Sequence, residues 1–360
     1  QGVVNRIEWM YQQYFFNAED IILQKTTFTF DVSVWEIFMP LCWGTKMVLC
    51  TKEDIVSPER ILSLIEKQNI SCLHFVPSML NAFITTLFGD KKINIQHSLK
   101  SLQKVITSGE ALSVETVRNW YKQLDIPIYN LYGPTEASVD VSYYNTTHKD
   151  RIIPIGRPIW NTQLYVVDNN YTSLMPIGTV GEICISGDGL ARGYLNKPEL
   201  TAERFIPNSF KEGERMYKTG DLGRWLADGN IEYIGRKDGQ VKIRGYRIEL
   251  GEIESALYTH QNIDSAVVVA KMNKAREKEL VAYIVSREEL NTTDIRSYLS
   301  KSLPSYMLPT HYVQLEALPL TPNGKIDKKN LPDPEGLGMN SGVEYIAPRN
   351  KTEEILVAVW

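Results

Sequence analysis

The chain has 360 residues, of which 43% are hydrophobic and 23% are charged, and its formal net charge is −4 at pH 7. This composition is typical of a globular protein with a sizeable core, and the length favours two domains. The small negative charge gives no electrostatic footprint for nucleic acid, and no apolar run is long enough to span a membrane. We therefore expect neither nucleic acid nor a membrane as a partner.

Four cysteines lie in apolar runs without CxxC spacing, namely Cys42, Cys50, Cys72 and Cys184. Reduced, buried thiols in a cytoplasmic protein fit this pattern better than disulfides or a zinc site. No secretory signal peptide is visible. The chain starts at Gln1 rather than Met and stops at Trp360 inside an apparent amphipathic helix, so we expect it to be a piece of a longer protein.

The first half of the sequence alternates between strand and helix patterns. The predicted strands are residues 26–30, 46–50, 71–76, 104–107 and 126–129. Ser57 and Ser113 each stand at the start of a helical pattern, where a hydroxyl can cap the first turn. Strands separated by helices predict a mostly parallel sheet that helices cover.

Asp31 lies where the predicted strand 26–30 gives way to a helical pattern, among aromatic residues. An N-cap is the ordinary explanation for an Asp at such a point. A partly buried carboxylate with few polar neighbours would also favour a cation, such as the ammonium group of a ligand. The residue pattern leaves both explanations open.

The segment NLYGPTE, residues 130–136, follows the predicted strand 126–129. Gly133 and Pro134 do not continue a strand, so Tyr132, Thr135 and Glu136 are expected on a loop. Ligands of open α/β sheets bind outside the carboxyl ends of the strands. These side chains could stack on a base, donate to a phosphate and bind a hard cation, although an ordinary solvated loop is the alternative.

After about residue 147 the pattern changes to short strands, 166–168, 182–186 and 230–234, separated by Gly/Asp turns. This spacing predicts an antiparallel or barrel-like piece. A predicted turn at 217–222 holds Asp221, which could bind sugar hydroxyls, unless it only forms an Asx turn. The polar, glycine-flanked segment 235–240 is predicted to be a hinge or linker.

A small α/β unit is predicted beyond this hinge, with helices over 251–257 and 293–303 and strands over 266–270 and 280–285. Asn323 and Gly324 favour a tight turn that would hold Lys325 at an exposed tip. Residues 333–345 have a linker-like composition, and a new helical pattern starts near residue 350.

Several longer motifs follow one another along the chain: FDVSVWEIF, NLYGPTE, GEICISGDGLARGYLNKPELTAERF, YKTGDL, GRKDGQVKIRGYRIELGEIE and LPLTPNGKIDKKNLP. In this order they resemble the adenylation domains of nonribosomal peptide synthetases, within the adenylate-forming enzymes. The resemblance extends to about Pro334, and the last fourteen residues are similar to the first helix of a carrier-protein domain. The family's Ser/Thr/Gly-rich phosphate loop, with the first third or more of the large subdomain, would then precede Gln1, and the fragment as cut could be inactive.

The resemblance implies an α/β fold in two parts. Residues 1–237 would be the C-terminal part of a large subdomain with mostly parallel, helix-covered sheets and a barrel-like β piece. Residues 238–334 would be a small, mobile α+β subdomain with its hinge at Asp238. Residues 335–346 would be a linker, and 347–360 the incomplete start of the carrier domain.

The implied activity is a two-step ligase reaction that uses ATP and Mg²⁺. An amino acid carboxylate attacks the α-phosphate of ATP, and the acyl group then passes to the phosphopantetheine thiol of a carrier domain in cis. Condensation domains of the same synthetase are further expected partners. An acyl- or aryl-CoA ligase of the same superfamily and a non-catalytic scaffold module are the alternatives.

Nucleotide-binding and catalytic roles follow from the same resemblance. The implied ATP-binding residues are Gly109, Tyr132, Gly133, Thr135, Asp221 and Arg236. Thr135 would contact the α-phosphate and Glu136 would hold Mg²⁺. Tyr132 would pack along the adenine and Asp221 would accept from the ribose hydroxyls. Lys325, carried in by rotation about the hinge, would bridge the substrate carboxylate and the phosphate, so that its removal slows adenylation ~100-fold or more.

The substrate pocket is likewise implied position by position. Its residues would be Asp31, Val32, Trp35, His74, Ile106, Ser108, Leu131, Val139, Asp140 and Lys325. Asp31 would pair with the α-ammonium group of a free amino acid, while Lys325 would hold its carboxylate.

Two large side chains, Trp35 and Leu131, would narrow this pocket, which also contains the polar residues His74, Ser108 and Asp140. A tight pocket with hydrogen-bonding groups favours a small hydroxylated side chain. The set is similar to the pattern that the family uses for serine. The alternative is that His74 and Asp140 form only a structural pair.

Overall fold

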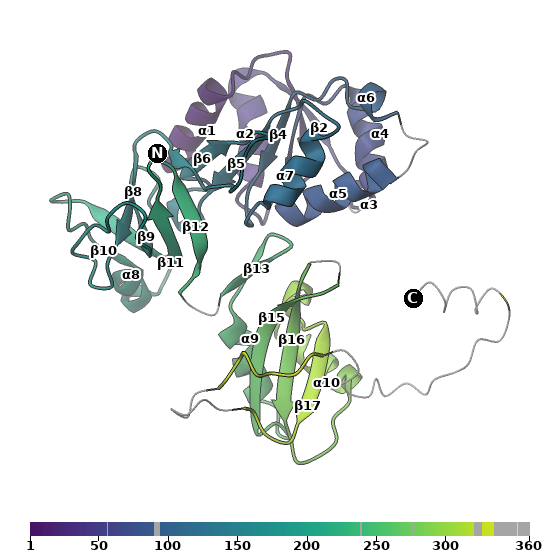
Figure 1. The fold of residues 1–360 in the computed structure, drawn as a ribbon, viewed down its shortest axis with the longest axis vertical. Helices are drawn as coiled ribbons and strands as arrows, with labels where there is room; N and C mark the ends of the chain where they lie inside the picture. The colour runs from purple at the N-terminus through teal and green to yellow at the C-terminus, as the bar shows by residue number, and fades with distance from the viewer. Residues whose placement is uncertain are drawn as a thin grey trace. The chain divides into compact units, whose positions relative to one another are not determined.

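The computed structural model describes residues 1–55, 57–89, 94–237, 240–274, 277–319, 326–334 and 351. The chain divides into two units, the first comprising Gln1–Asp238 with Lys242–Tyr246 and the second Gly239–Val241 with Arg247–Trp360 (Figure 1). The hinge residue Asp238, the tip lysine Lys325 and the predicted linker lie outside the described residues, as does the predicted carrier segment apart from Lys351.

The first unit contains a seven-stranded sheet in the order β2-β1-β3-β4-β5-β6-β7. The five strands from β2 to β5 in this order are parallel, and β6 and β7 continue the sheet in antiparallel pairing. The strands are β1 Ile21–Gln24, β2 Lys46–Leu49, β3 Cys72–Phe75, β4 Lys104–Thr107, β5 Ile128–Tyr132, β6 Ser142–Asn145 and β7 Arg157–Pro158. The predicted mostly parallel sheet is confirmed.

Helices cover this sheet on both faces (Figure 1). They are α1 Gly2–Gln13, α2 Ser33–Trp43, α3 Lys52–Ile55, α4 Pro58–Gln68, α5 Pro77–Gly89, α6 Ile95–Ser98 and α7 Val114–Tyr121. Both predicted N-caps are confirmed, because the Ser57 hydroxyl accepts from the backbone N–H of Arg60 and the Ser113 hydroxyl accepts from that of Thr116.

The pleat of β3 decides which face of the sheet each of its side chains reaches. Leu73 and Phe75 belong to the buried cluster formed with α4, α5 and α7, whereas Cys72 belongs to the cluster formed with α1 and α2. Since side chains alternate along a strand, His74 shares the face of Cys72. The predicted pocket residue His74 therefore lies on the side of the sheet that α1 and α2 cover.

Two predicted strands differ from the observed ones. The strand predicted over 26–30 is wrong, since β1 ends at Gln24 and the following residues form turns. The buried carboxylate of Glu36 in α2 holds these turns by accepting from the backbone N–H and the hydroxyl of Thr26, at 3.0 and 2.8 Å. The strand predicted to end at residue 129 continues to Tyr132, because β5 pairs with both β4 and β6.

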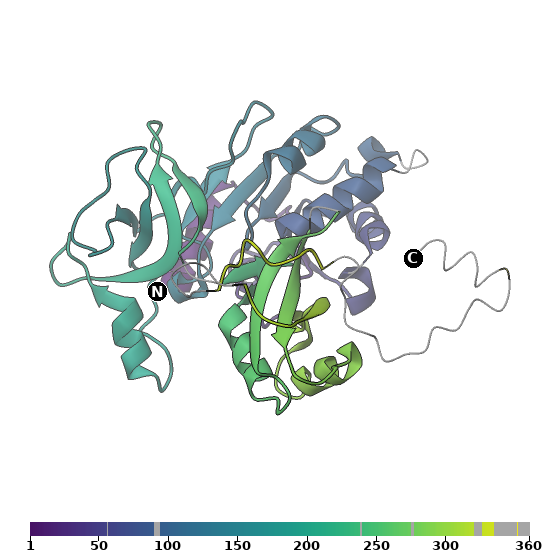
Figure 2. The same cartoon turned by 60° about the horizontal axis from the view of Figure 1, so that its bottom comes forward.

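The barrel-like piece predicted after residue 147 is a curled antiparallel sheet in the order β10-β11-β9-β8, with β12 also paired to β11 (Figure 2). Its elements are β8 Thr162–Val167, β9 Gly181–Gly187, α8 Pro198–Arg204, β10 Phe205–Pro207, β11 Arg215–Trp225 and β12 Ile231–Arg236. A separate cluster of buried side chains, which includes Ile183, Ile185 and Tyr217, forms its core.

The second unit is a small α+β body. Strand β16 pairs antiparallel with β15 and parallel with β17. The elements of this unit are α9 Leu250–Tyr258, β15 Ser265–Met272, β16 Lys278–Val285, α10 Thr292–Leu299 and β17 His311–Leu315. Strands β13 Val241–Ile243 and β14 Tyr246–Ile248 form a separate two-stranded sheet, and residues Lys242–Tyr246 within it belong to the first unit. None of the helices in the described part of the chain is long and apolar enough to cross a membrane.

Candidate functional site

The segment after β5 makes a tight turn that only glycine allows at its start. A Cβ atom on Gly133 would lie 2.4 Å from the carbonyl oxygen of Val139 and 2.6 Å from the Cα of Asp140. Ser138 and Val139 have φ angles of 63° and 81°, a left-handed conformation that is costly for a β-branched residue. The turn therefore folds residues 139–140 back onto residue 133 and brings two predicted site segments together.

Thr135, at the start of the short 3₁₀ helix Thr135–Ala137, contacts the predicted ammonium-binding residue. Its hydroxyl donates a 2.6 Å hydrogen bond to Asp31 Oδ2. Helix α2 begins at Ser33 after the N-cap residue Val32, without a capping side chain, so the N-cap explanation for Asp31 is wrong. The Asp31 carboxylate is instead directed to the turn that follows β5.

Burial shifts the titration of Asp31. Desolvation raises the pKa of its carboxyl group above the usual value, although the hydrogen bond from Thr135 partly opposes this shift. A carboxylate that has lost part of its hydration favours a cation beside it. The site therefore suits the ammonium group of a small molecule.

Glu136 is held by the curled sheet region, because the Tyr194 hydroxyl donates a 2.8 Å hydrogen bond to its Oε1. Among the described residues, no group of three or more His, Cys, Asp or Glu side chains could hold a metal ion by itself. Mg²⁺ in nucleotide sites usually takes one or two carboxylates and completes its shell with phosphate oxygens and water. A single half-buried Glu136 fits that pattern.

Asp221 lies in strand β11 rather than in the predicted turn. The pairing of β11 with β9 shifts register just before this residue, and Gly220 has a φ of 74°. Such a bulge redirects the side chains beside it. Asp221 faces Arg236 of β12, whose Nη1 donates to Oδ1 at 2.9 Å, and the Tyr132 hydroxyl donates to Oδ2 at 2.5 Å.

The carboxylate of Glu182 holds this bulge, and sequence reasoning missed it. Glu182 is buried in β9 and accepts from the backbone N–H of Gly220 at 3.1 Å and from the Tyr171 hydroxyl at 2.8 Å. The ammonium group of Lys237 lies 3.4 Å from its second oxygen. An acidic residue inside an apolar strand, as in GEICISG, was the available signal.

The predicted apolar pocket residues all belong to one buried cluster. They are Val32 and Trp35 near the start of α2, Ile106 of β4, Leu131 of β5 and Val139 of the tight turn. The indole N–H of Trp35 is buried and has no hydrogen-bond partner among the described residues. A buried donor of this kind can bind an acceptor atom of a ligand.

The predicted polar pocket residues form two separate pairs. His74 Nε2 lies 3.0 Å from the Ser108 hydroxyl, and both residues are buried. Asp140 is paired with Arg6 of α1, with side chains that are each 2% exposed. The alternative of a direct pair between His74 and Asp140 is therefore wrong. Burial lowers the pKa of His74 well below its usual value, so its ring is neutral at pH 7.

Gly109 directly follows this polar group. Its φ of 89° lies in the region that favours glycine, and it lies beside Val76, which follows β3. The carboxyl ends of β3, β4 and β5 thus meet at one edge of the sheet, as the parallel pairing requires. That edge carries the predicted positions His74, Ile106, Ser108, Gly109, Leu131 and Tyr132.

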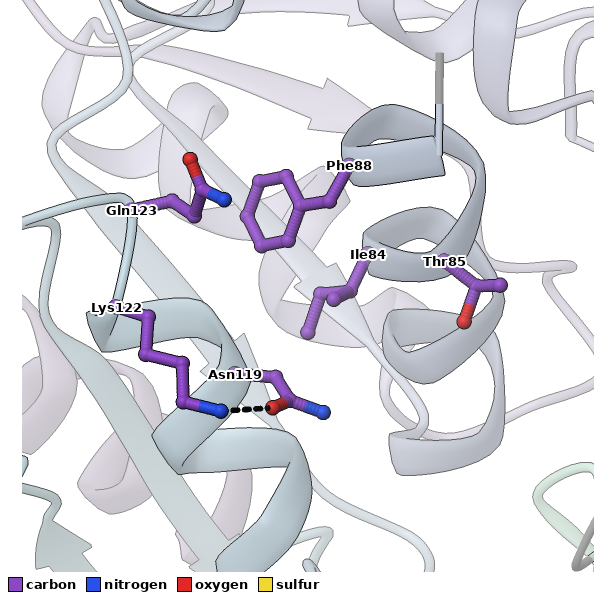
Figure 3. A pocket seen from close by; sticks show the side chains of 6 residues that line it. All are labelled: Ile84, Thr85, Phe88, Asn119, Lys122 and Gln123. Atoms are coloured by element: carbon purple, nitrogen blue, oxygen red, sulfur yellow. Dashed lines mark hydrogen bonds between the residues drawn. The ribbon is translucent and has the colours of Figure 1, made fainter. Parts of the chain in front are cut away.

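A hollow of about 250 Å³ lies on the other face of the sheet, between α5 and α7 (Figure 3). Its lining residues are Ile84, Thr85, Phe88, Asn119, Lys122 and Gln123. Lys122 donates to Asn119 of its own helix region at 3.2 Å. None of the predicted site residues lines this hollow, and we assign it no role.

The sequence matches two family models. Residues 1–195 match the AMP-binding enzyme model, and residues 252–325 match the model of the AMP-binding enzyme C-terminal domain. The chain therefore belongs to the AMP-binding enzyme family, which is a family of adenylate-forming ligases.

Within that family the chain is similar to peptide synthetases. It is 49% identical over 369 residues to a component of the mycosubtilin synthase of Bacillus subtilis, a match that covers 100% of this chain and 14% of that protein. The chain thus spans a small part of the length of this relative.

Two solved structures share the fold. One is a nonribosomal peptide synthetase protein containing adenylation and PCP domains, with a TM-score of 0.76, 28% identity and coverage of 87% of this chain and 53% of that one. The other is the Vibrio cholerae adenylation domain AlmE in complex with glycyl-adenosine-5'-phosphate, with a TM-score of 0.79, 26% identity and coverage of 90% and 61%. Both neighbours support the fold class predicted from the sequence.

Proposed function

We propose that the full-length protein uses ATP to activate L-serine as seryl-AMP and then transfers the seryl group to the phosphopantetheine thiol of a carrier protein. The observation that carries this proposal is the 2.6 Å hydrogen bond between Thr135 and Asp31. It joins a carboxylate suited to an ammonium group to a turn whose next residue, Glu136, is suited to a nucleotide-bound cation.

The first half-reaction forms a bond between a carboxylate oxygen of the amino acid and the α-phosphorus of ATP. The bond from that phosphorus to the bridging oxygen breaks, and pyrophosphate leaves. In-line displacement at phosphorus depends on positioning and charge neutralisation rather than on a protein nucleophile. Asp31 would hold the α-ammonium group, and the Thr135 hydroxyl, whose one O–H donates to Asp31 in the free protein, would turn to donate to the α-phosphate.

Further residues would complete the nucleotide site. Asp221, oriented by Tyr132 and Arg236, would accept from the ribose hydroxyls. Lys325 keeps the role implied by the resemblance, in which its ammonium group offsets the repulsion between the two anions. Mg²⁺ bound at Glu136 would neutralise charge on the phosphates.

The preference for serine is supported by unpaired hydrogen-bonding capacity in a narrow pocket. Asp140 can accept from a substrate hydroxyl, and the Trp35 indole N–H, which has no partner among the described residues, can donate to it. Alanine would leave these groups unpaired, and sites built for a hydroxyl reject such analogues by roughly 10⁴-fold. The hydrogen-bonded side chains of His74 and Ser108 would add uncharged polar groups to the lining of the pocket.

In the second half-reaction the carrier thiolate would attack the carbonyl carbon of seryl-AMP, a C–S bond would form and AMP would leave. The small subdomain would rotate about Asp238 between the two steps. The division of the chain next to that residue, and the PCP domain of a structural neighbour, support this proposal. Condensation domains would be partners in the same protein. The four cysteines are free thiols, which is compatible with a cytoplasmic location.

Amino-acid-dependent ATP–pyrophosphate exchange in the full-length protein tests the proposal. Serine should support the fastest exchange, and alanine should be poorer by several orders of magnitude. Exchange with alanine or a large apolar residue and none with serine would refute the substrate. Absence of ATP binding would instead favour a non-catalytic scaffold, and a thioester formed only with free coenzyme A would favour a CoA ligase.

A further inference from the structure

Helix α1 carries an arginine on its buried face. Arg6 is 1% exposed, and Ile7, Trp9 and Met10 are buried beside it. The guanidinium group lies 5.9 Å from the centre of the Trp9 ring, and its Nη1 contacts the sulfur of Met10. A charge in such apolar surroundings requires an ionic partner, because the desolvation of an unpaired charge is costly.

That partner is Asp140, 134 residues later in the chain. Arg6 donates from Nε at 3.1 Å and also from Nη2, and both hydrogen bonds end on the same oxygen, Oδ2. Among the described residues, Arg6 is the only side chain that donates to this carboxylate. The other oxygen, Oδ1, is therefore left as an acceptor at the turn that also carries Val139.

The surroundings of Asp140 make this arrangement depend on Arg6. The hydroxyl of Tyr14, just after α1, is buried without a partner among the described residues, and burial raises its pKa, so it brings no charge. Asp31 is close enough for its negative charge to interact with Asp140. Lys242 is the cation that acts on Asp31, whereas Arg6 is the cation paired with Asp140.

We propose that Arg6 is a positioning residue for substrate choice: it holds Oδ2 of Asp140 by two hydrogen bonds, so that Oδ1 is presented to the side-chain hydroxyl of the substrate. The inference rests on the proposed activation of serine. Arg6 does not touch the substrate in this scheme and acts only through Asp140. Without it, the Asp140 carboxylate would lose the two donors that fix its orientation.

The test uses the full-length protein and pyrophosphate exchange with serine and alanine at neutral pH. In Arg6→Met, kcat/KM for serine should fall about 100-fold, the size expected when one partner of a buried charge pair is removed. Activity with alanine should change little, and the KM for ATP should stay the same.

A second variant separates charge from geometry. Arg6→Lys keeps the positive charge but loses the planar two-point donor, so it should lose about tenfold in serine kcat/KM, less than Arg6→Met loses. Arg60→Met is the matched control, because Arg60 is an exposed arginine on α4 that is paired only at 3.8 Å with Asp54. Its serine to alanine ratio should equal that of the wild type. Thermal unfolding reports whether each variant is folded.

The outcomes distinguish the two proposals. If the wild-type protein shows no serine-dependent exchange, the proposed substrate fails whatever the variants do. If the wild type prefers serine and Arg6→Met keeps the same serine to alanine ratio, the role of Arg6 is overturned alone. Should Arg6→Met fail to fold, Arg6→Lys decides, since an unchanged serine to alanine ratio in that variant also overturns the role.

Discussion

The hydroxyl of Thr135 donates a 2.6 Å hydrogen bond to the carboxylate of Asp31, which lies 104 residues earlier in the chain. The bond joins the turn before α2 to the turn after β5. Because burial raises the pKa of Asp31, the ionised carboxylate is less favourable in the folded protein than in water. The free protein thus carries an electrostatic cost at this position that a bound ammonium group would relieve.

Replacing Asp31 by Asn should separate activity from stability. We expect Asp31→Asn to lower kcat/KM for the amino acid about 100-fold or more, since the ammonium group loses its counter-charge. The same variant should unfold at a higher temperature than the wild type at pH 7, because a desolvated charge has been removed. Pyrophosphate exchange and thermal unfolding measure the two effects.

The stability gain predicted for Asp31→Asn should depend on pH, and the direction of the pKa shift of Asp31 fixes how. A carboxyl group whose pKa is raised by folding favours the folded state at low pH and loses that contribution as pH rises through the raised value. The gain in Asp31→Asn should therefore be largest near neutral pH and shrink on acidification. The exposed Asp125→Asn serves as the control. An equal gain at all pH values would contradict the assignment of the shift to Asp31.

Gly133 should not tolerate even the smallest side chain. In Gly133→Ala the new Cβ would meet backbone atoms at 2.4 to 2.9 Å, and backbone does not move aside as a side chain does. We expect a loss of about 2 kcal/mol or more in the free energy of unfolding, with loss of exchange activity. Gly89→Ala, at the end of α5 with no atom within 4 Å of its added Cβ, should be neutral or slightly stabilising. Denaturant unfolding compares the two.

Asp221 should control nucleotide binding without affecting the choice of amino acid. We expect Asp221→Asn to raise the KM for ATP ~10-fold or more, because a charged acceptor for hydroxyl groups becomes a weaker one. Glu232→Gln is the matched control, since Glu232 pairs with Arg224 across the same two strands at 2.6 Å. If both variants raise the KM equally, loss of strand pairing rather than a ribose contact is responsible.

His74 should make the protein sensitive to mild acid. Since burial lowers its pKa in the folded state, the unfolded chain binds a proton below about pH 6.5 that the folded chain does not. Stability should fall on acidification by up to about 1.4 kcal/mol per pH unit from this group. His74→Gln should reduce the slope of unfolding free energy between pH 6.5 and 5, while the exposed His148→Gln should keep it. An unchanged slope in His74→Gln would argue against a neutral buried ring.

The parts of the fold that could be predicted from the sequence are those encoded locally. The helix caps at Ser57 and Ser113 depend only on neighbouring residues, and both were predicted. The alternation of strand and helix patterns is also local, and it predicted the parallel sheet. The strand predicted over 26–30 failed because Glu36, in the next helix, captures Thr26 and holds the segment in turns. Nothing in residues 26–30 alone specifies that contact.

The candidate site shows the same limit. The resemblance supplied positions such as Asp31 and Asp140, but not the partners that orient them. Arg6 donates to Asp140, which lies 134 residues later in the chain. Glu182 of β9 accepts from the backbone N–H of Gly220 in the neighbouring strand β11 and so holds the bulge beside Asp221. Such pairs follow from how the strands are ordered in the sheet, which the pattern of a single segment does not contain.

The ion pair between α1 and the turn after β5 also has a consequence for protein engineering. An exchange of pocket segments between relatives that starts after residue 13 would leave α1 behind and separate Arg6 from Asp140. The chimera would then combine an acidic pocket with a helix selected for a different one. Grafts intended to transfer substrate choice should therefore begin upstream of α1. A junction is suitable only if Arg6 and Asp140 come from the same parent.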